Sequence, residues 1–116
     1  MGVRTLQLDD RPVEVWYPVE PTAVEGQSSE IFDSINAISE VLRPFIPGDL
    51  GGEVDTGTYR DAPPATDGGP FPTAAYSHGS PGYRQAATFL TGHLASHGII
   101  TIAVEHLGRS LSTLLT

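Results

Sequence analysis

The first apolar residues of the chain fall into two short runs that favour β-structure. Residues 3–8 and 13–17 are both rich in residues that occur often in strands. Between them, residues 9–12 read Asp-Asp-Arg-Pro, a composition typical of a turn. The pattern predicts an antiparallel β-hairpin over residues 1–18.

Residues 19–72 combine a helical pattern with a long stretch of loop composition. Within 29–45, isoleucine and leucine recur at helical spacing, a serine precedes them and Pro44 marks a stop, which predicts a helix there. Residues 47–72 are rich in Gly, Pro, Asp and Thr. A stretch of this length is typically a functional or covering loop. We therefore predict an insertion over the edge of the sheet.

Residues 73–106 show a strand, helix and strand in succession. A short strand is predicted at 73–77, then a Gly/Pro turn at 80–82 and a helix at 83–97 that Gly98 caps. The helix is expected to bury Ala87, Leu90 and Leu94. Residues 99–104 are nearly all apolar and β-branched, as in a parallel strand buried on both faces.

A strand-helix-strand unit places its two strands in parallel, so the predicted fold class is α/β with an incomplete sheet. Residues 107–116 form a short tail. The strand at 99–104 needs neighbours at both edges and helices on both faces, and this chain supplies few of them. Poor solubility, a partly molten state or self-association through the unfinished sheet is expected.

Charge divides the chain into an acidic front and a nearly neutral back. The net charge is −8, and 13 of the 14 acidic residues lie at or before Asp67, while every histidine follows it. This distribution suggests a solvated front and a buried, functional back. The basic residues are scattered arginines without a single lysine, so no basic stripe suits nucleic acid.

Cysteine usage and apolar runs leave the compartment open. The chain has no cysteine, which excludes disulfides and thiolate metal sites but fits either a cytoplasmic or a secreted protein. The longest apolar runs fall far short of the ~20 residues of a membrane-spanning helix, so no membrane span is predicted. No signal peptide is visible in this sequence.

Residues 77–84, Ser-His-Gly-Ser-Pro-Gly-Tyr-Arg, carry the most informative chemistry. They lie between a predicted buried strand and a predicted helix, where glycines permit close approach of the backbone and unpaired N–H groups converge. Such amides form an anion site. In ester hydrolysis, two such donors stabilise the developing oxyanion by several kcal/mol.

Residues 70–106, PFPTAAYSHGSPGYRQAATFLTGHLASHGIITIAVEH, resemble the strand, oxyanion loop, first helix and next strand of α/β-hydrolases. The similarity is closest to the platelet-activating-factor acetylhydrolase and dienelactone-hydrolase-like serine esterases. VEVWYPV and RDAPPA also resemble the second strand and the pre-strand loop of this group. The resemblance covers most of the chain outside residues 19–52 and implies the N-terminal portion of an α/β-hydrolase fold.

The resemblance also implies the roles of individual residues. The backbone N–H of Ser80 would be one donor of the oxyanion hole. Tyr83 would line the substrate cleft or offer a rival N–H donor, with His78, Gly79 and Gly82 as structural support. The implied substrate is a small-molecule or lipid-like ester, and no cofactor is implied.

The catalytic triad of a serine hydrolase is not predicted within these residues. Its nucleophile sits in G-x-S-x-G, and the closest match is Gly-Arg-Ser-Leu-Ser around Ser110, which lacks the closing glycine. Family topology places the nucleophile after one more helix and strand, beyond Thr116. We therefore expect an inactive N-terminal fragment of a serine esterase. The alternative is a naturally short, non-catalytic binding module that uses the same anion-accepting loop.

Two other groups of residues have simpler readings. His93 and His97 are four residues apart on the predicted helix, with Glu105 and His106 downstream, a spacing that can hold a metal. A histidine beside a helix C-terminus is favoured by the helix dipole, so no metal site is expected. The aromatic residues on predicted strands are expected in the core: Trp16, Tyr17 and Tyr76.

Overall fold

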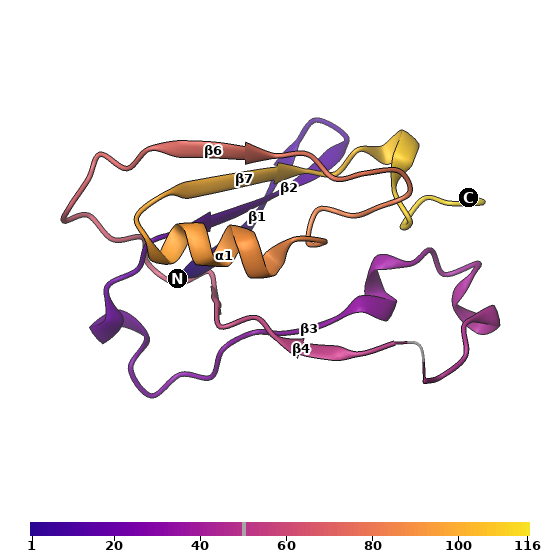
Figure 1. Ribbon diagram of the computed structural model, residues 1–116, viewed down its shortest axis with the longest axis horizontal. Helices are drawn as coiled ribbons and strands as arrows, with labels where there is room; N and C mark the ends of the chain where they lie inside the picture. Colours follow the sequence, from indigo (N-terminus) through magenta and orange to yellow (C-terminus); the bar gives the residue numbers. More distant parts are fainter. Residues whose placement is uncertain (50) are drawn as a thin grey trace.

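The computed structural model describes residues 1–49 and 51–116; Leu50, inside the predicted 47–72 loop, lies outside the described residues. Five strands form one mixed sheet in the order β5-β1-β2-β7-β6 (Figure 1). We call this the main sheet. Its strands are β1 (Gly2–Leu8), β2 (Arg11–Tyr17), β5 (Tyr59–Arg60), β6 (Thr73–Tyr76) and β7 (Ile100–Val104).

A second, two-stranded sheet lies apart from the main sheet (Figure 1). It consists of β3 (Ile31–Asp33) and β4 (Glu53–Asp55). The α-helix found in the described residues is α1 (Thr88–Ser96), and no described helix has the length and hydropathy to cross a bilayer. The short 3-10 helices are η1 (Pro21–Val24), η2 (Ser34–Ala37), η3 (Arg43–Phe45) and η4 (Leu107–Arg109).

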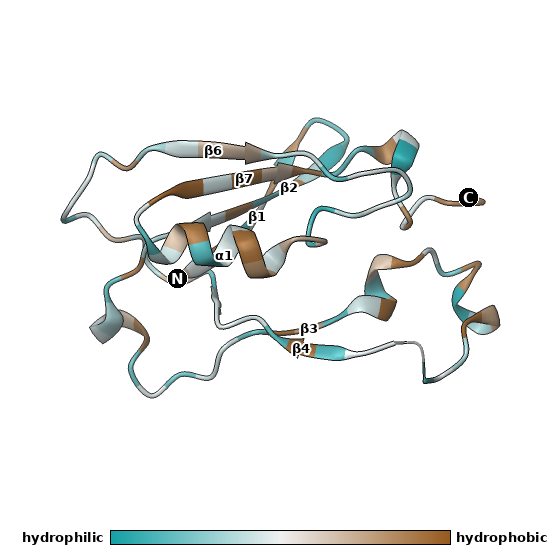
Figure 2. Ribbon diagram, viewed as in Figure 1, coloured by the Kyte–Doolittle hydropathy of each residue, from teal (hydrophilic) through white to brown (hydrophobic). Residues whose placement is uncertain are grey.

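The predicted hairpin is confirmed. β1 and β2 pair antiparallel from Gly2↔Tyr17 to Leu8↔Arg11, so the turn consists of two residues. Asp9 takes a positive φ of 54°, a conformation that aspartate tolerates better than most residues. The turn residues are hydrophilic, as the colouring of the hairpin tip shows (Figure 2).

The predicted parallel pair is also confirmed, since β6 and β7 run parallel from Thr73↔Ile100 to Tyr76↔Ala103. The expectation that the 99–104 strand lacks neighbours is wrong, because β7 also pairs antiparallel with β2. The chain between β2 and β7 returns β7 to the side of the hairpin. The two edges of the main sheet are therefore β5 and β6, and β7 lies inside the sheet.

The expectation that β7 is buried on both faces is also wrong. Its exposure alternates: Thr101 and Ala103 are buried, whereas Ile100, Ile102 and Val104 are half-buried. Neighbouring residues of a strand point to opposite faces, and α1 packs on only one of them, against β2 and β7. The other face keeps an apolar patch lined by Arg4, Leu6, Val15, Tyr17, Pro64 and Ile100.

The helix predicted at 83–97 begins later, at Thr88. The preceding residues form tighter turns, in which Ala86 N–H donates to Tyr83 C=O and Thr88 N–H to Gln85 C=O. The N–H of Arg84 donates to the Glu105 carboxylate at 2.9 Å, so these turns are attached to the end of β7 by a tertiary contact.

The face that α1 buries differs from the prediction, although Ala87 is buried as expected. Leu90 is 42% exposed, and the helix packs instead through Thr91, Gly92 and Ala95. These small residues allow close approach to the sheet, where Trp16 supplies the bulk of the core. The predicted glycine cap is confirmed, since Gly98 has a φ of +82° and Ile99 N–H donates to Leu94 C=O.

The helix predicted at 29–45 is wrong. The structure has strand β3 and the short turns η2 and η3 in its place. The Asp33 side chain accepts the N–H of Ile35, which starts a 3-10 turn, and Ser34 N–H donates to Gly52 C=O. Ile31 stays 53% exposed. An amphipathic helix is stabilised mainly by packing its apolar face against another surface. Here β3 instead forms its backbone hydrogen bonds by pairing with β4.

Candidate active site

Residues 77–84 follow the C-terminal end of β6, beside the parallel β7, and we call them the 77–84 loop. The loop is fastened to the segment around η4. Gly82 forms an isolated parallel bridge with Ser110: its N–H donates to Arg109 C=O at 3.0 Å, and its C=O accepts from Leu111 N–H at 2.8 Å. A Cβ at Gly82 would lie 2.7 Å from the Gly79 carbonyl oxygen, so the turn requires glycine there.

His78 lies inside the loop and is only 3% exposed. The backbone N–H of His106 donates to its Nε2 at 2.9 Å, so this nitrogen must be unprotonated. The other nitrogen, Nδ1, lies 2.7 Å from Gly79 C=O and must carry the proton that it donates. Both ring nitrogens are engaged by the backbone, which suits a structural residue and leaves neither free to act as a base.

Ser80 lies exposed at the tip of the loop, next to the exposed Gly79. Within residues 1–49 and 51–116, its backbone N–H has no hydrogen-bond acceptor. It borders a groove of about 370 Å³, whose walls are formed by the loop, η4 and the C-terminal tail. The lining residues are Ser80, Pro81, Leu107, Gly108, Arg109, Ser110, Thr113, Leu114 and Leu115.

Tyr83 occupies a different place from Ser80. Its half-buried ring stacks on Phe32 of β3, with 5.9 Å between centroids and 27° between planes, and it is not among the residues that line the groove. This contact ties the two-stranded sheet to the 77–84 loop. The aromatic residues expected in the core are there in two cases, since Trp16 is 1% and Tyr17 6% exposed, and Tyr76 packs half-buried against the core.

Ser110, the nearest match to a nucleophile motif, is 2% exposed. Its Oγ donates to Glu105 at 2.5 Å and lies 2.6 Å from Ser112 Oγ. No imidazole is hydrogen-bonded to it among the described residues. The arrangement is that of a structural hydroxyl.

The structure brings Ser77 and His106 together as a hydroxyl–imidazole pair that the sequence did not predict. Ser77 Oγ lies 2.7 Å from His106 Nε2, and the His106 ring leans on His78 at 4.7 Å between centroids. No carboxylate is hydrogen-bonded to His106 in the part of the chain that the structure describes. The two residues are 29 positions apart and meet because β6 and β7 are parallel neighbours, so no local motif could have indicated the pair.

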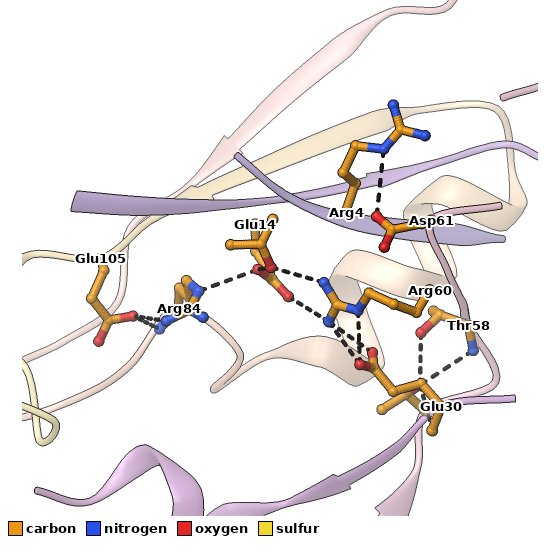
Figure 3. Close-up of polar contacts among 10 residues, drawn as sticks. Arg4, Glu14, Glu30, Thr58, Arg60, Asp61, Arg84 and Glu105 are labelled. Atoms are coloured by element: carbon orange, nitrogen blue, oxygen red, sulfur yellow. Dashed lines mark hydrogen bonds and ion pairs between the residues drawn. The ribbon is translucent and has the colours of Figure 1, made fainter. Parts of the chain in front are cut away.

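A chain of alternating charges runs from Glu30, next to β3, through Arg84 of the 77–84 loop to Glu105, after β7 (Figure 3). Glu14 on β2, 1% exposed, lies at its centre. It accepts from Arg60 at 2.9 Å and from Arg84 at 3.2 Å. Arg60 continues to Glu30 at 2.7 Å and Arg84 to Glu105 at 3.2 Å. Two guanidinium groups thus alternate with three carboxylates.

These contacts change the pKa of Arg60, the more exposed of the two arginines. Burial acts to lower the pKa of the Arg60 guanidinium, but hydrogen bonds and charge from Glu30 and Glu14 raise it above its ordinary value.

The expectation of a solvated acidic half is wrong for Glu14, because its side chain is 1% exposed. The available signal was an acidic residue inside the apolar run Val-Glu-Val-Trp, a position that demands a charged partner.

The two helical histidines lie together at the end of α1. Their rings are 4.4 Å apart between centroids, and His97 Nδ1 lies 3.0 Å from the His93 carbonyl oxygen. In residues 1–49 and 51–116 no group of three or more possible metal ligands converges. Glu105 and His106 lie instead at the end of β7, where they contact Arg84, Ser77 and His78.

The mixed sheet with its parallel β6–β7 pair, the intervening helix and the loop at their carboxyl ends define a partial α/β-hydrolase fold. The chain belongs to the family described as platelet-activating factor acetylhydrolase, isoform II, whose match spans residues 5–116. The expected relation to acetylhydrolases and esterases is confirmed.

A curated relative from Schizosaccharomyces pombe, named "Putative phospholipase A2", is 31% identical over 106 residues. The match covers 81% of this chain and 24% of the relative. The chain therefore spans about a quarter of the length of the curated relative that it matches. No solved structure matches the chain.

Proposed function

We propose that the chain is the N-terminal part of a serine carboxylic-ester hydrolase of the acetylhydrolase or phospholipase type. In this proposal the 77–84 loop is the oxyanion loop, and the Ser80 N–H is one donor of the oxyanion hole. The substrate is a lipid-like or small-molecule ester, as the names of the family and of the relative suggest. The observation that carries the proposal is the N–H of Ser80, which borders a groove and has no acceptor among the described residues, on a loop whose neighbouring residues are hydrogen-bonded.

The proposed chemistry depends on the negative charge that develops during ester hydrolysis. When an ester carbonyl is attacked, negative charge develops on its oxygen, and a fixed N–H stabilises that charge more in the transition state than in the ground state. His78 cannot supply a base because both its nitrogens are bound by the backbone. The proposal therefore assigns the nucleophile, acid and base to sequence beyond Thr116. The length of the relative supports this assignment.

The Ser80 amide can be removed by one substitution. Ser80→Pro lacks the N–H, whereas the matched control Ser80→Ala keeps it and loses only the hydroxyl. In the protein translated from the complete reading frame, we expect Ser80→Pro to lower kcat for p-nitrophenyl acetate by about 10²–10³-fold, the usual effect of losing one oxyanion donor. Ser80→Ala should stay within about threefold. Thermal melts of both variants check that the fold survives.

Full activity in a folded Ser80→Pro variant would contradict the assignment. The 116-residue chain itself should show no enzyme-like hydrolysis of p-nitrophenyl acetate. Activity of this chain that disappears in Ser110→Ala or Ser77→Ala would show that the nucleophile lies within it. A stop codon directly after Thr116 would instead support the non-catalytic binding module.

A further inference from the structure

Glu105 follows β7 directly, and its side chain is only 1% exposed. It accepts three hydrogen bonds. One oxygen accepts the backbone N–H of Arg84 at 2.9 Å and the Arg84 Nη1 at 3.2 Å. The other accepts the hydroxyl of Ser110. A single carboxylate therefore contacts both the end of the oxyanion loop and the segment that follows η4.

Both segments contribute to holding the oxyanion loop in place. Ser110 is the residue that bridges to Gly82, two positions after Ser80. Arg84 is the last residue of the loop, and its guanidinium is turned toward the sheet by a second carboxylate, that of Glu14 (Figure 3). The loop is thus fixed at Arg84, whose amide and guanidinium donate to Glu105, and at Gly82. The backbone partners of Gly82, Arg109 and Leu111, flank the Ser110 whose hydroxyl donates to Glu105.

We propose that Glu105 is a positioning residue for the oxyanion loop, a role that rests on the proposed function of that loop. It does not border the groove next to Ser80 and so has no contact with a substrate held there. It acts through Arg84 and Ser110. Misplacement of a catalytic donor by about 1 Å can lower a rate about 10²-fold, so the constraint matters for turnover.

The first experiment measures the loop directly and needs no activity. In the 116-residue chain, Glu105→Gln keeps the size of the side chain but removes the charge that binds Arg84. Amide hydrogen exchange followed by NMR should accelerate at least tenfold at Arg84 and Gly82. Thr101, inside β7, should exchange at its former rate. Asp61→Asn, an acid-to-amide change in the exposed pair with Arg4, should leave all these amides unchanged.

The second experiment uses the protein from the complete reading frame. Glu105→Gln should lower kcat for p-nitrophenyl acetate at least tenfold while KM stays within twofold, because the lost constraint acts on the transition state. Glu105→Asp retains the charge one methylene shorter and should recover part of kcat. Ser110→Ala, which removes only one of the three hydrogen bonds, provides a milder variant if Glu105→Gln does not fold.

The outcomes separate the two proposals. Accelerated exchange confined to the loop supports the positioning role even if the wild-type protein proves inactive, which would refute the proposed function alone. Unchanged exchange at Gly82 and Arg84, in Glu105→Gln or in the milder variant, would overturn the positioning role. An increase in exchange that is equal at Thr101 would also overturn it, because Glu105 would then stabilise the whole fold. If the wild-type protein is active, an equal activity of Glu105→Gln would do the same.

Discussion

The main sheet and the two-stranded sheet β3–β4 are stabilised by different interactions. In the main sheet, Val3, Trp16, Ala95 and Ala103 form a core in which each is at most 1% exposed. In the two-stranded sheet, no residue is fully buried, and apolar side chains remain open to solvent. Apolar burial stabilises the first region, whereas backbone pairing and tethers such as the Phe32–Tyr83 stack hold the second.

This contrast teaches that apolar spacing alone does not decide structure. Residues 29–45 carry helical spacing of isoleucine and leucine, yet they form no α-helix, because no surface is available to cover the stripe. α1 has only a short apolar face of small residues, but it packs against β2 and β7 and is therefore helical. The difference between the two regions predicts very different responses to substitution.

The largest effect is expected in the core of the main sheet. Trp16→Ala should lower the free energy of unfolding by about 3–5 kcal/mol, since it removes the largest fully buried side chain and leaves a cavity. Urea unfolding of the purified chain measures this. Phe89→Ala on α1 is the control, because Phe89 is 78% exposed and should cost at most about 0.5 kcal/mol. Similar losses for the two variants would mean that Trp16 does not form the core.

The next largest effect concerns the buried charge at Glu14. Glu14→Gln leaves Arg60 and Arg84 without their shared carboxylate and should cost about 3 kcal/mol, as breaking a buried pair does. Asp10→Asn removes an exposed carboxylate paired with Arg11 and should change stability by less than about 1 kcal/mol. If Glu14→Gln were as mild as the control, the alternating chain of charges would not link the two regions in solution.

A pH-dependent effect is expected at Tyr17, which joins β2 to the loop before β6. Its hydroxyl donates to Ala62 C=O at 2.6 Å, and burial is the main cause that raises its pKa above 10.0. A raised pKa means that the stability contribution is complete below pH 10.0 and is lost as the pH rises through the higher folded-state pKa.

Tyr17→Phe should remove this dependence and cost about 1 kcal/mol near neutral pH through the lost hydrogen bond. The measurement is the difference in unfolding free energy between wild type and variant from neutral to alkaline pH. That difference should shrink as Tyr17 ionises. A difference that stays constant with pH would indicate that the pKa of Tyr17 is not raised.

The smallest effect is expected at the turns between β3 and β4. Phe45 is 80% exposed, so Phe45→Ala should change the unfolding free energy by no more than about 0.5 kcal/mol. Thermal denaturation at several protein concentrations provides the check. A large or concentration-dependent loss of stability would show that the Phe45 side chain is buried in solution. Apolar burial would then also stabilise the region of the two-stranded sheet.

Local sequence signals were sufficient for the elements that the tertiary environment also favours. The hairpin and the glycine at the end of α1 follow from patterns a few residues long, and the parallel β6–β7 pair follows from the order strand, helix, strand over residues 73–106. Local signals and the fold agree at these elements, which explains why these predictions were confirmed. The role of the 77–84 loop stays a prediction.

Long-range contacts, and not the local sequence, established the non-helical path of residues 31–45, the partners of β7 and the burial of Glu14 and Glu105. Each depends on contacts between residues far apart in the chain, such as Glu14 with Arg84, 70 positions away. Long-range pairing of charges and backbone groups outweighs local propensity wherever water is excluded, because an unpaired buried group is costly.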